Sequence, residues 1–203
     1  MHNITSVVFD VGNVLFRWNI ACLFEKLIKD RQELNWFLAN VVTPQWHFEH
    51  DAGKPLAIMR AELVAQFPDY AALIDAYLTR FNETIPGPVP GSLEIVADLA
   101  ARGVPLFAIT NFGAEFWDGF HPTQPVFAYF RDIVVSGREK LVKPDPAIYR
   151  LALERFGLAP GAAIFIDDSL LNIDAARANG FAGHHFQDAA MLRAELTALA
   201  LLD

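Results

Sequence analysis

Residues 4–16 of this chain read ITSVVFDVGNVLF, where an apolar and β-branched run ends at Asp10 and a Gly12-Asn13 turn follows. Such a run predicts a buried β-strand that delivers one carboxylate to its C-terminal end. In open α/β sheets, ligands bind outside the carboxyl ends of the strands. A carboxylate at that edge can attack an electrophile or bind a hard metal ion, so Asp10 is the first candidate functional residue.

Other polar side chains follow two later apolar runs in the same way. They are Thr110 and Asn111 after VPLFAI, Asp167 and Asp168 after AIFI, and, between these pairs in the chain, Lys143 in LVKPDP. Because parallel strands end at one edge of a sheet, these side chains should converge on Asp10. Lys143 follows the run DIVVS by several residues, so its loop must fold back to reach the same place.

From residue 86 onward, strand-like runs alternate with amphipathic helical patterns. Including the first run, we expect strands at 7–10, 104–110, 131–136, 162–168 and 181–186. We expect helices at 92–103, 115–120, 146–157, 170–180 and 189–202. This alternation predicts an α/β protein with right-handed crossovers and a parallel sheet covered on both faces.

Residues 19–84 have a different pattern. Their apolar residues recur at i, i+3, i+4 and i+7, which is typical of amphipathic helices, and no convincing strand is present. The segment IPGPVPG at 85–91 predicts a rigid linker. We therefore expect residues 17–85 to form an all-helical insertion after the first strand. Residues 1–16 and 86–203 would form the α/β core.

Composition limits the classes of partner. With 53% hydrophobic and 20% charged residues among 203, the chain has enough apolar material for a sizeable core. A formal net charge of −8 argues against a nucleic-acid partner but is compatible with a small anionic substrate held by a metal ion. Cys22 is the only cysteine, so no intrachain disulfide forms. We find no signal peptide and no bilayer-spanning run, and therefore expect a cytoplasmic protein with no membrane partner.

The polar set suits phosphoryl transfer. Asp10 could attack phosphorus and form an aspartyl-phosphate. Clustered carboxylates repel one another, and Mg²⁺ relieves this; Asp10, Asp168 and the main-chain carbonyl near Gly12 would supply oxygen ligands. The phosphate oxygens, which accumulate charge, would be held by Thr110, Asn111, the catalytic cation Lys143 and the backbone amides at Gly12 and Asn13.

Each residue also has a simpler interpretation. An aspartate that ends a strand is often a turn former, and Thr110-Asn111 alone would suit a helix cap. Lys143 alone could be a solvated surface lysine. Asp167-Asp168-Ser169 could cap the helix that begins near Leu170. The order and placement of the residues together favour a functional site.

At this point the chain resembles the haloacid dehalogenase superfamily of aspartate-nucleophile hydrolases. The matching pieces are FDVGNVLF, ITNF, VKPDPAIY and FIDDSLLNIDAARANG. The resemblance implies a Rossmann-like three-layer α/β/α core and a helical cap of the subfamily I type, inserted after the first motif. It also implies Asp10 as nucleophile, Thr110 and Lys143 as phosphate binders, and Asp168 with Asp167 at Mg²⁺.

One position departs from the family pattern. Most phosphatases of the superfamily carry a second aspartate two residues after the nucleophile as general acid and base, and here that position is Gly12. The Asp-x-Gly-Asn-Val form resembles a subset that includes sugar-1-phosphate phosphatases. Either the substrate has a good leaving group or a cap residue supplies the proton. The candidates in QWHFEHDAG are His47, Glu49, His50 and Asp51.

The leading hypothesis is a Mg²⁺-dependent phosphatase of a small phosphorylated metabolite, with sugar phosphates among the candidates, acting through an aspartyl-phosphate. A 2-haloacid dehalogenase, in which Asp10 attacks carbon without a metal, is one alternative. A non-catalytic domain that binds a metabolite or a partner protein is another, with Gly12 marking a retired active site. Both a monomer and a homodimer are compatible with the sequence.

Overall fold

Five parallel strands form the central sheet of the protein, whose computed structural model describes residues 4–203; residues 1–3 of the expected core segment lie outside the described part. The strands are β1 (Ser6–Phe9), β4 (Leu106–Thr110), β5 (Asp132–Val135), β6 (Ala163–Asp167) and β7 (Ala182–His185), in the spatial order β5-β4-β1-β6-β7. Every neighbouring pair is parallel, which confirms the expected sheet. After β1 the chain adds β4 and β5 on one side of this strand, and it then crosses over to add β6 and β7 on the other side. This reversal favours ligand binding at the carboxyl end of β1.

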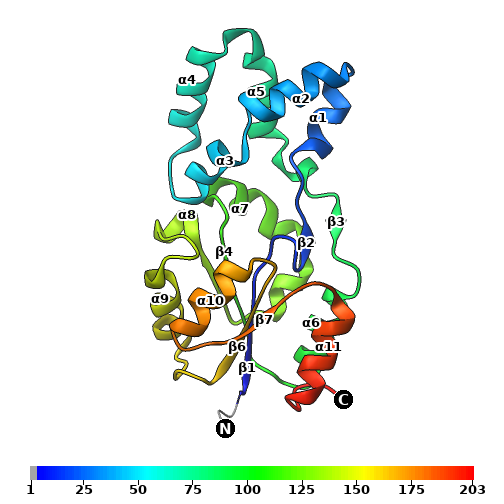
Figure 1. Ribbon diagram of the computed structural model, residues 1–203, viewed down its shortest axis with the longest axis vertical. Coiled ribbons are helices and arrows are strands. Elements are labelled where there is room, and N and C mark those ends of the chain that lie inside the picture. Colours follow the sequence, from blue (N-terminus) through cyan, green and yellow to red (C-terminus); the bar gives the residue numbers. More distant parts are fainter. Residues whose placement is uncertain (1–3) are drawn as a thin grey trace.

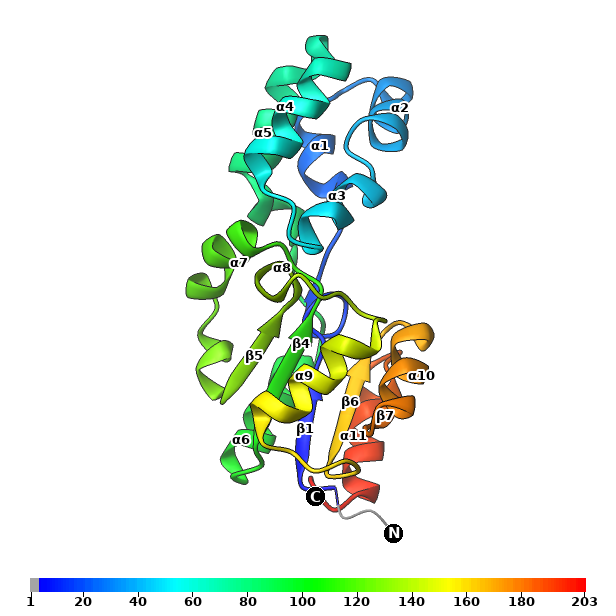
Figure 2. The same ribbon diagram turned by 90° about the vertical axis from the view of Figure 1, so that its left-hand side faces the viewer.

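Helices cover both faces of the sheet. On one face lie α9 (Pro146–Phe156) and α10 (Leu170–Ala178), and on the other α6 (Ser92–Ala101) and α11 (Ala189–Ala198) (Figures 1 and 2). Because successive strand residues point to opposite faces, Val8 packs with the first pair of helices, while Val7 and Phe9 join the core on the other side. The predicted three-layer α/β/α class is confirmed.

The segment between β1 and β4 is mostly helical. It contains α1 (Ala21–Leu27), α2 (Arg31–Asn40), α3 (Pro44–Asp51), α4 (Leu56–Gln66) and α5 (Ala71–Thr79), with 3₁₀ turns at Pro68–Tyr70 and Phe81–Thr84. Side-chain caps fix two helix starts, because Asp30 accepts a hydrogen bond from the Glu33 N–H at 2.7 Å and Thr43 from the Trp46 N–H at 3.1 Å. These helices gather beyond the carboxyl ends of the strands (Figure 1).

The junction between the two parts contains a short antiparallel pair that the sequence analysis did not predict. Within the expected linker at 85–91, β3 (Gly87–Pro88) pairs with β2 (Phe16–Arg17). Two residues per strand are too few to show an alternating pattern, and Pro88 argues against a strand. The two connections between the helices and the sheet are therefore held to each other.

The remaining elements lie on the sheet side of the molecule. They are α7 (Ala114–Phe120), α8 (Ser136–Glu139) and 3₁₀ turns at His121–Thr123 and Pro125–Tyr129. The short helix α8 was not expected, because four residues carry no helical period. Within residues 4–203 no helix has the length and apolar character needed to cross a bilayer.

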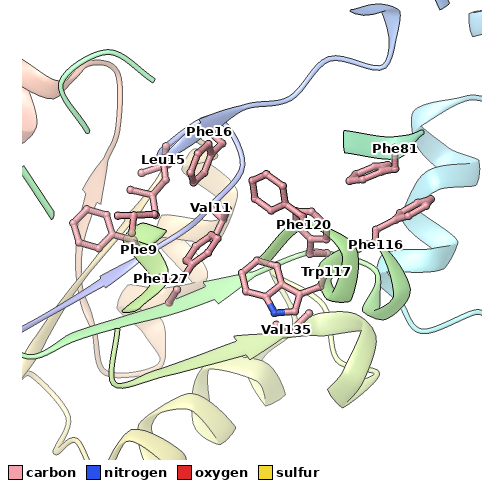
Figure 3. Close-up of a cluster of buried hydrophobic side chains, with 14 of the residues drawn as sticks. Phe9, Val11, Leu15, Phe16, Phe81, Phe116, Trp117, Phe120, Phe127 and Val135 are labelled. Carbon is pink, nitrogen blue, oxygen red and sulfur yellow. The ribbon is translucent and has the colours of Figure 1, made fainter. Parts of the chain in front are cut away.

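The helical segment is docked on α7 and α8 through α3 and the turn after α5. The Ser136 hydroxyl donates to the Asp51 carbonyl at 2.6 Å and accepts from the Phe112 N–H at 2.9 Å. Phe81 stacks on Phe116 with ring centroids 3.9 Å apart (Figure 3). These contacts place the end of α3 over the carboxyl edge of the sheet.

Replacing Gly113, which precedes α7, with alanine should weaken this docking. A Cβ there would lie 1.8 Å from Cδ2 of His50 on α3, so one of the two must move. We expect Gly113→Ala to lower the free energy of unfolding by about 1–3 kcal/mol, the usual cost of overpacking, in urea titrations followed by circular dichroism.

Gly119→Ala is the matched control. A Cβ at this position in α7 would meet no atom within 4 Å, and alanine favours a helix, so stability should stay equal or rise. Unchanged stability of Gly113→Ala would contradict the described docking.

Candidate active site

Asp10 lies immediately after the buried strand β1. Its N–H donates to the Ile166 carbonyl of β6 at 2.8 Å, and its Oδ1 accepts from the Val11 N–H at 2.7 Å. The residue is 8% exposed. The sheet therefore fixes both the backbone and one carboxylate oxygen at the edge where ligands are expected.

Lys143 joins Asp10 to the end of β6, as the sequence analysis required of its loop. Its Nζ lies 2.8 Å from Asp10 Oδ1 and 2.7 Å from Asp167 Oδ2. The lysine and both carboxylates are buried. Residues far apart in sequence thus meet around one ammonium group.

Asn111 holds the Lys143 loop in place. Its side-chain Nδ2 donates to the Lys143 carbonyl at 3.0 Å, and its Oδ1 accepts from the Lys143 N–H at 2.8 Å. Contact between this side chain and a phosphate would compete with these bonds. The structure thus shows the Asn111 side chain supporting Lys143, and its contact with a phosphate stays a prediction.

Asp167 is completely buried. Besides Lys143, it accepts hydrogen bonds from the Ser169 N–H at 2.8 Å and from Asn172 Nδ2 at 3.0 Å. Helix capping and ion pairing thus coexist at this residue, whereas the Ser169 side chain makes no cap bond. The sequence analysis did not identify Asn172. The feature that could have indicated this residue is a side-chain amide in the first turn of the helix that follows Asp167.

Asp168 completes an acidic cluster. One carboxylate oxygen each from Asp10, Asp167 and Asp168 lies within 4.8 Å of the others. Asn13, in the left-handed conformation with φ 53°, accepts a hydrogen bond from the Trp18 N–H at 3.1 Å. Burial and Asp167 raise the pKa of the Asp168 carboxyl, and the nearby Asn13 side chain opposes part of this rise.

The single ammonium group of Lys143 does not balance the negative charge of the three clustered carboxylates. The pKa of Asp10 is raised to about 7, chiefly by burial, with Lys143 opposing the rise and Asp167 and Asp168 adding to it. Burial alone would lower the pKa of Lys143, yet Asp10 and Asp167 raise it above its ordinary value. The donor set consists of hard carboxylate oxygens with the Gly12 carbonyl nearby in the chain, so these residues fit a cation such as Mg²⁺.

Thr110 offers an unpaired hydroxyl next to this cluster. The residue ends β4, is 1% exposed, and its Oγ1 has no hydrogen-bond partner among residues 4–203. Buried hydroxyls in proteins are nearly always paired. A bound anion that accepts this hydrogen bond would satisfy the group, which agrees with the expected place of a phosphate oxygen.

A largely apolar cavity of about 180 Å³ adjoins the turn after Asp10. Its apolar lining consists of Val11, Phe16, Trp18, Phe81, Ile85, Phe112 and Phe120, and its polar lining of Gly12, Arg17, His47, Asp51 and Asn111. Phe16 and Phe120 meet edge to face at 5.1 Å, and Figure 3 shows them between the β1 turn and α7. The cavity thus joins the turn after Asp10 to an aromatic end.

The polar candidates on α3 divide into two groups. His47 and Asp51 line the cavity, as expected for side chains four residues apart on one helical face. His50 is buried elsewhere, with its Nδ1 2.8 Å from the Lys54 carbonyl. Glu49 is exposed and pairs with the Lys54 ammonium at 2.6 Å.

Comparison with known proteins supports the same fold. The family model described as haloacid dehalogenase-like hydrolase matches residues 4–180. A sesquiterpene phosphatase, astK, of Aspergillus oryzae is 26% identical over 202 residues, covering 96% of this chain and 95% of that protein. A phosphoglycolate phosphatase of Nitrosococcus oceani is 38% identical over 95 residues, covering 45% of this chain and only 41% of its own length.

Solved structures share the fold at low sequence identity. A predicted haloacid dehalogenase-like hydrolase from Porphyromonas gingivalis has a TM-score of 0.76 at 18% identity, covering 98% of both chains. A family enzyme from Bacteroides thetaiotaomicron, solved as a magnesium complex, has a TM-score of 0.71 at 18% identity, covering 94% of this chain and 99% of that one.

Replacing Lys143 with methionine should destabilise the protein. Methionine would leave Asp10 and Asp167 buried without their shared cation, and removing one partner of a buried ion pair costs about 3–5 kcal/mol. We expect this loss in chemical denaturation without metal. Added MgCl₂ should stabilise the variant more than the wild type, because a cation would neutralise the same carboxylates.

Lys54→Met is the matched control, because Lys54 also pairs with two carboxylates, Glu49 and Glu62, but at the surface. Its stability should change little. If Lys143→Met were as stable as the wild type, the ammonium group would not be the link described here.

Proposed function

We propose that this chain, which belongs to the haloacid dehalogenase-like hydrolases, is a Mg²⁺-dependent phosphatase. It cleaves a small phosphate monoester through an aspartyl-phosphate on Asp10. The observation that carries the proposal is the buried Lys143 ammonium between Asp10 and Asp167, beside the Thr110 hydroxyl that lacks a partner. An attacking carboxylate and phosphate-binding groups are what phosphoryl transfer requires.

Each residue has a distinct role in this proposal. Asp10 Oδ2 attacks phosphorus, since Oδ1 is held by the Val11 N–H and Lys143. The Lys143 ammonium and the Thr110 hydroxyl bind phosphate oxygens, together with the backbone amide at Gly12. The Asn13 N–H, expected in the same role, donates instead to the Phe16 carbonyl at 2.7 Å. Asn111 positions Lys143.

The acidic cluster would hold the metal. Asp10, Asp167, Asp168 and the Gly12 carbonyl provide its oxygen ligands in this proposal. When bound, Mg²⁺ neutralises charge that develops on the phosphate oxygens. The magnesium complex of the Bacteroides thetaiotaomicron enzyme supports this choice of ion.

We further propose that residues 17–85 act as a cap on a catalytic core formed by residues 1–16 and 86–203. The cap would exclude water from the phosphate and contribute part of the substrate pocket. The paired junction strands β2 and β3 would serve as the hinge. The docked contacts of Ser136 and Phe116 represent the closed arrangement.

The cavity favours a substrate with an apolar alcohol part. Phe16, Trp18 and Phe81 are among its lining residues, and its ionisable lining side chains are Arg17, His47 and Asp51. A sugar would need several hydrogen bonds from such a wall, whereas a hydrocarbon needs only burial. The full-length similarity to a sesquiterpene phosphatase supports the apolar choice over the sugar phosphate suggested by the Asp-x-Gly-Asn-Val motif.

The dehalogenase alternative is less well supported. Attack on carbon needs one carboxylate, and it leaves the clustering of Asp167 and Asp168 beside Asp10 without a chemical purpose. The retained set of Asp10, Lys143 and Thr110 likewise argues against a purely binding domain.

Asp10→Asn should abolish hydrolysis of p-nitrophenyl phosphate in the presence of Mg²⁺, because an amide oxygen is a poor nucleophile. Wild type should lose activity on chelation and regain it with added Mg²⁺. Asp118→Asn, which changes an exposed carboxyl paired with Arg138, should keep full activity. Halide release from a 2-haloacid without metal, with no phosphatase activity, would instead favour the dehalogenase.

The substrate preference should follow hydrocarbon length. Along a series from ethyl to octyl phosphate, kcat/KM should rise by roughly fourfold per methylene until the cavity is full, since each buried CH₂ is worth about 0.8 kcal/mol. Glucose 1-phosphate is the polar comparison and should be the poorer substrate. A flat alkyl series with efficient hydrolysis of the sugar phosphate would reverse this assignment.

A further inference from the structure

The proposed reaction needs an acid that the sheet edge does not supply. When an alkyl phosphate is cleaved, the departing oxygen must be protonated, since a free alkoxide is a very poor leaving group. Two residues after Asp10 stands Gly12, and a Cβ built there would meet no atom within 4 Å. The space above this glycine is therefore open, and it forms part of the cavity.

Asp51 is the carboxyl group that lines the same cavity. It ends α3, which lies over α7 and α8 in both views (Figures 1 and 2), and is 5% exposed. Its carbonyl is bonded to the Ser136 hydroxyl at 2.6 Å, which fixes its backbone to the core. Its Oδ1 is buried without any hydrogen-bond partner in the part of the chain that the structure describes, a costly state that a ligand or a proton acceptor would relieve.

The neighbours of Asp51 orient its other oxygen. The Tyr77 hydroxyl lies 2.7 Å from His47 Nδ1, and His47 Nε2 lies 3.5 Å from Asp51 Oδ2. Burial, aided by nearby His50, lowers the pKa of His47 to about 3, so its ring is neutral. With the tyrosine donating to Nδ1, the ring carries its hydrogen on Nε2 and faces Oδ2, which leaves Oδ1 free for proton transfer.

The environment of Asp51 also suits an acid that works near neutral pH. The pKa of Asp51 is raised to about 8, chiefly by burial, with the Gly113 N–H and Lys143 opposing the rise and Asp10 adding to it. A carboxyl group in such a site keeps its proton until the substrate needs it, and acid catalysis is most effective when the pKa lies near the working pH.

We propose that Asp51 replaces the acid missing at Gly12, as the proton donor and acceptor of the phosphatase reaction proposed above, on which this inference rests. In the first half-reaction Asp10 Oδ2 forms a bond to phosphorus, the ester P–O bond breaks, and the proton of Asp51 moves to the leaving oxygen to give the alcohol. In the second, the Asp51 carboxylate takes a proton from water while that water oxygen attacks phosphorus. The Asp10–phosphorus bond breaks, inorganic phosphate leaves, and Asp51 is protonated again.

Other polar side chains of α3 fit this role less well. The His47 ring is neutral and its Nδ1 is occupied by Tyr77. The His50 Nδ1 donates to the Lys54 carbonyl, and this ring does not line the cavity. Glu49 is exposed and pairs with Lys54.

The test compares Asp51→Asn with two substrates, octyl phosphate and p-nitrophenyl phosphate, in the presence of Mg²⁺. Octyl phosphate needs the acid, so its kcat should fall by about 10²–10⁴-fold, the usual contribution of general acid–base catalysis. The p-nitrophenolate ion leaves without a proton, so a rapid burst of one equivalent per site should persist. Slow turnover should follow the burst, because water still needs the missing base.

Glu49→Gln, on the same helix but exposed, is the matched control and should behave as the wild type. Wild-type turnover of octyl phosphate by Asp51→Asn would overturn the role of Asp51, as would loss of the burst in a folded variant. If the wild type hydrolyses neither ester, the phosphatase proposal itself fails, and the Asp51 inference falls with it.

A second variant covers the case in which Asp51→Asn does not fold. Asp51→Ala leaves room for a small carboxylic acid, and formate should restore part of its turnover of octyl phosphate. Formate should not change the activity of Glu49→Gln. Absence of rescue in a folded Asp51→Ala protein that still gives the nitrophenolate burst would contradict proton transfer by Asp51.

Discussion

The ammonium group of Lys143 organises the site. Within residues 4–203, it is the only group of the loop after β5 that contacts the ends of both β1 and β6. It lies 2.8 Å from Asp10 and 2.7 Å from Asp167, out of contact with solvent. Burying three charges this closely is costly unless they compensate one another. Hydrogen bonds hold these groups in place: Asp10 is bonded to the Ile166 carbonyl, and the Lys143 backbone is bonded to the Asn111 side chain. The same arrangement leaves Asp168 and the Thr110 hydroxyl available to a metal ion and an anion.

The sequence was sufficient to predict the sheet and most of the site for one physical reason. Polar residues directly after buried parallel strands must share an edge, so Asp10, Thr110 and Asp167 could be grouped before any coordinates were known. Lys143 required a loop to fold back, and the structure contains that loop. What could not be predicted depends on packing at short range. The Asn111 amide turns toward the Lys143 backbone, and the β2–β3 pair has no periodic signal.

Asp51 illustrates the same limit. Helical spacing places His47 and Asp51 on one face of α3, but the sequence does not say which face meets the core, because α3 carries polar residues on all sides. The docking of α3 on Ser136 decides it. The aromatic cavity between the two parts of the chain then combines the turn after Asp10, an apolar end and one buried acid. Of the four polar candidates in QWHFEHDAG, the structure places His47 and Asp51 at this cavity.

The central claim is that Asp10 carries the phosphoryl group during turnover. Rapid acid quench of the enzyme with Mg²⁺ and p-nitrophenyl phosphate, followed by peptide mass spectrometry, tests it most directly. The account predicts the mass of one added phosphoryl group on the peptide that contains Asp10, appearing on the time scale of turnover. Turnover with this peptide unmodified at every quench time, or with the phosphoryl group on another residue, would contradict it.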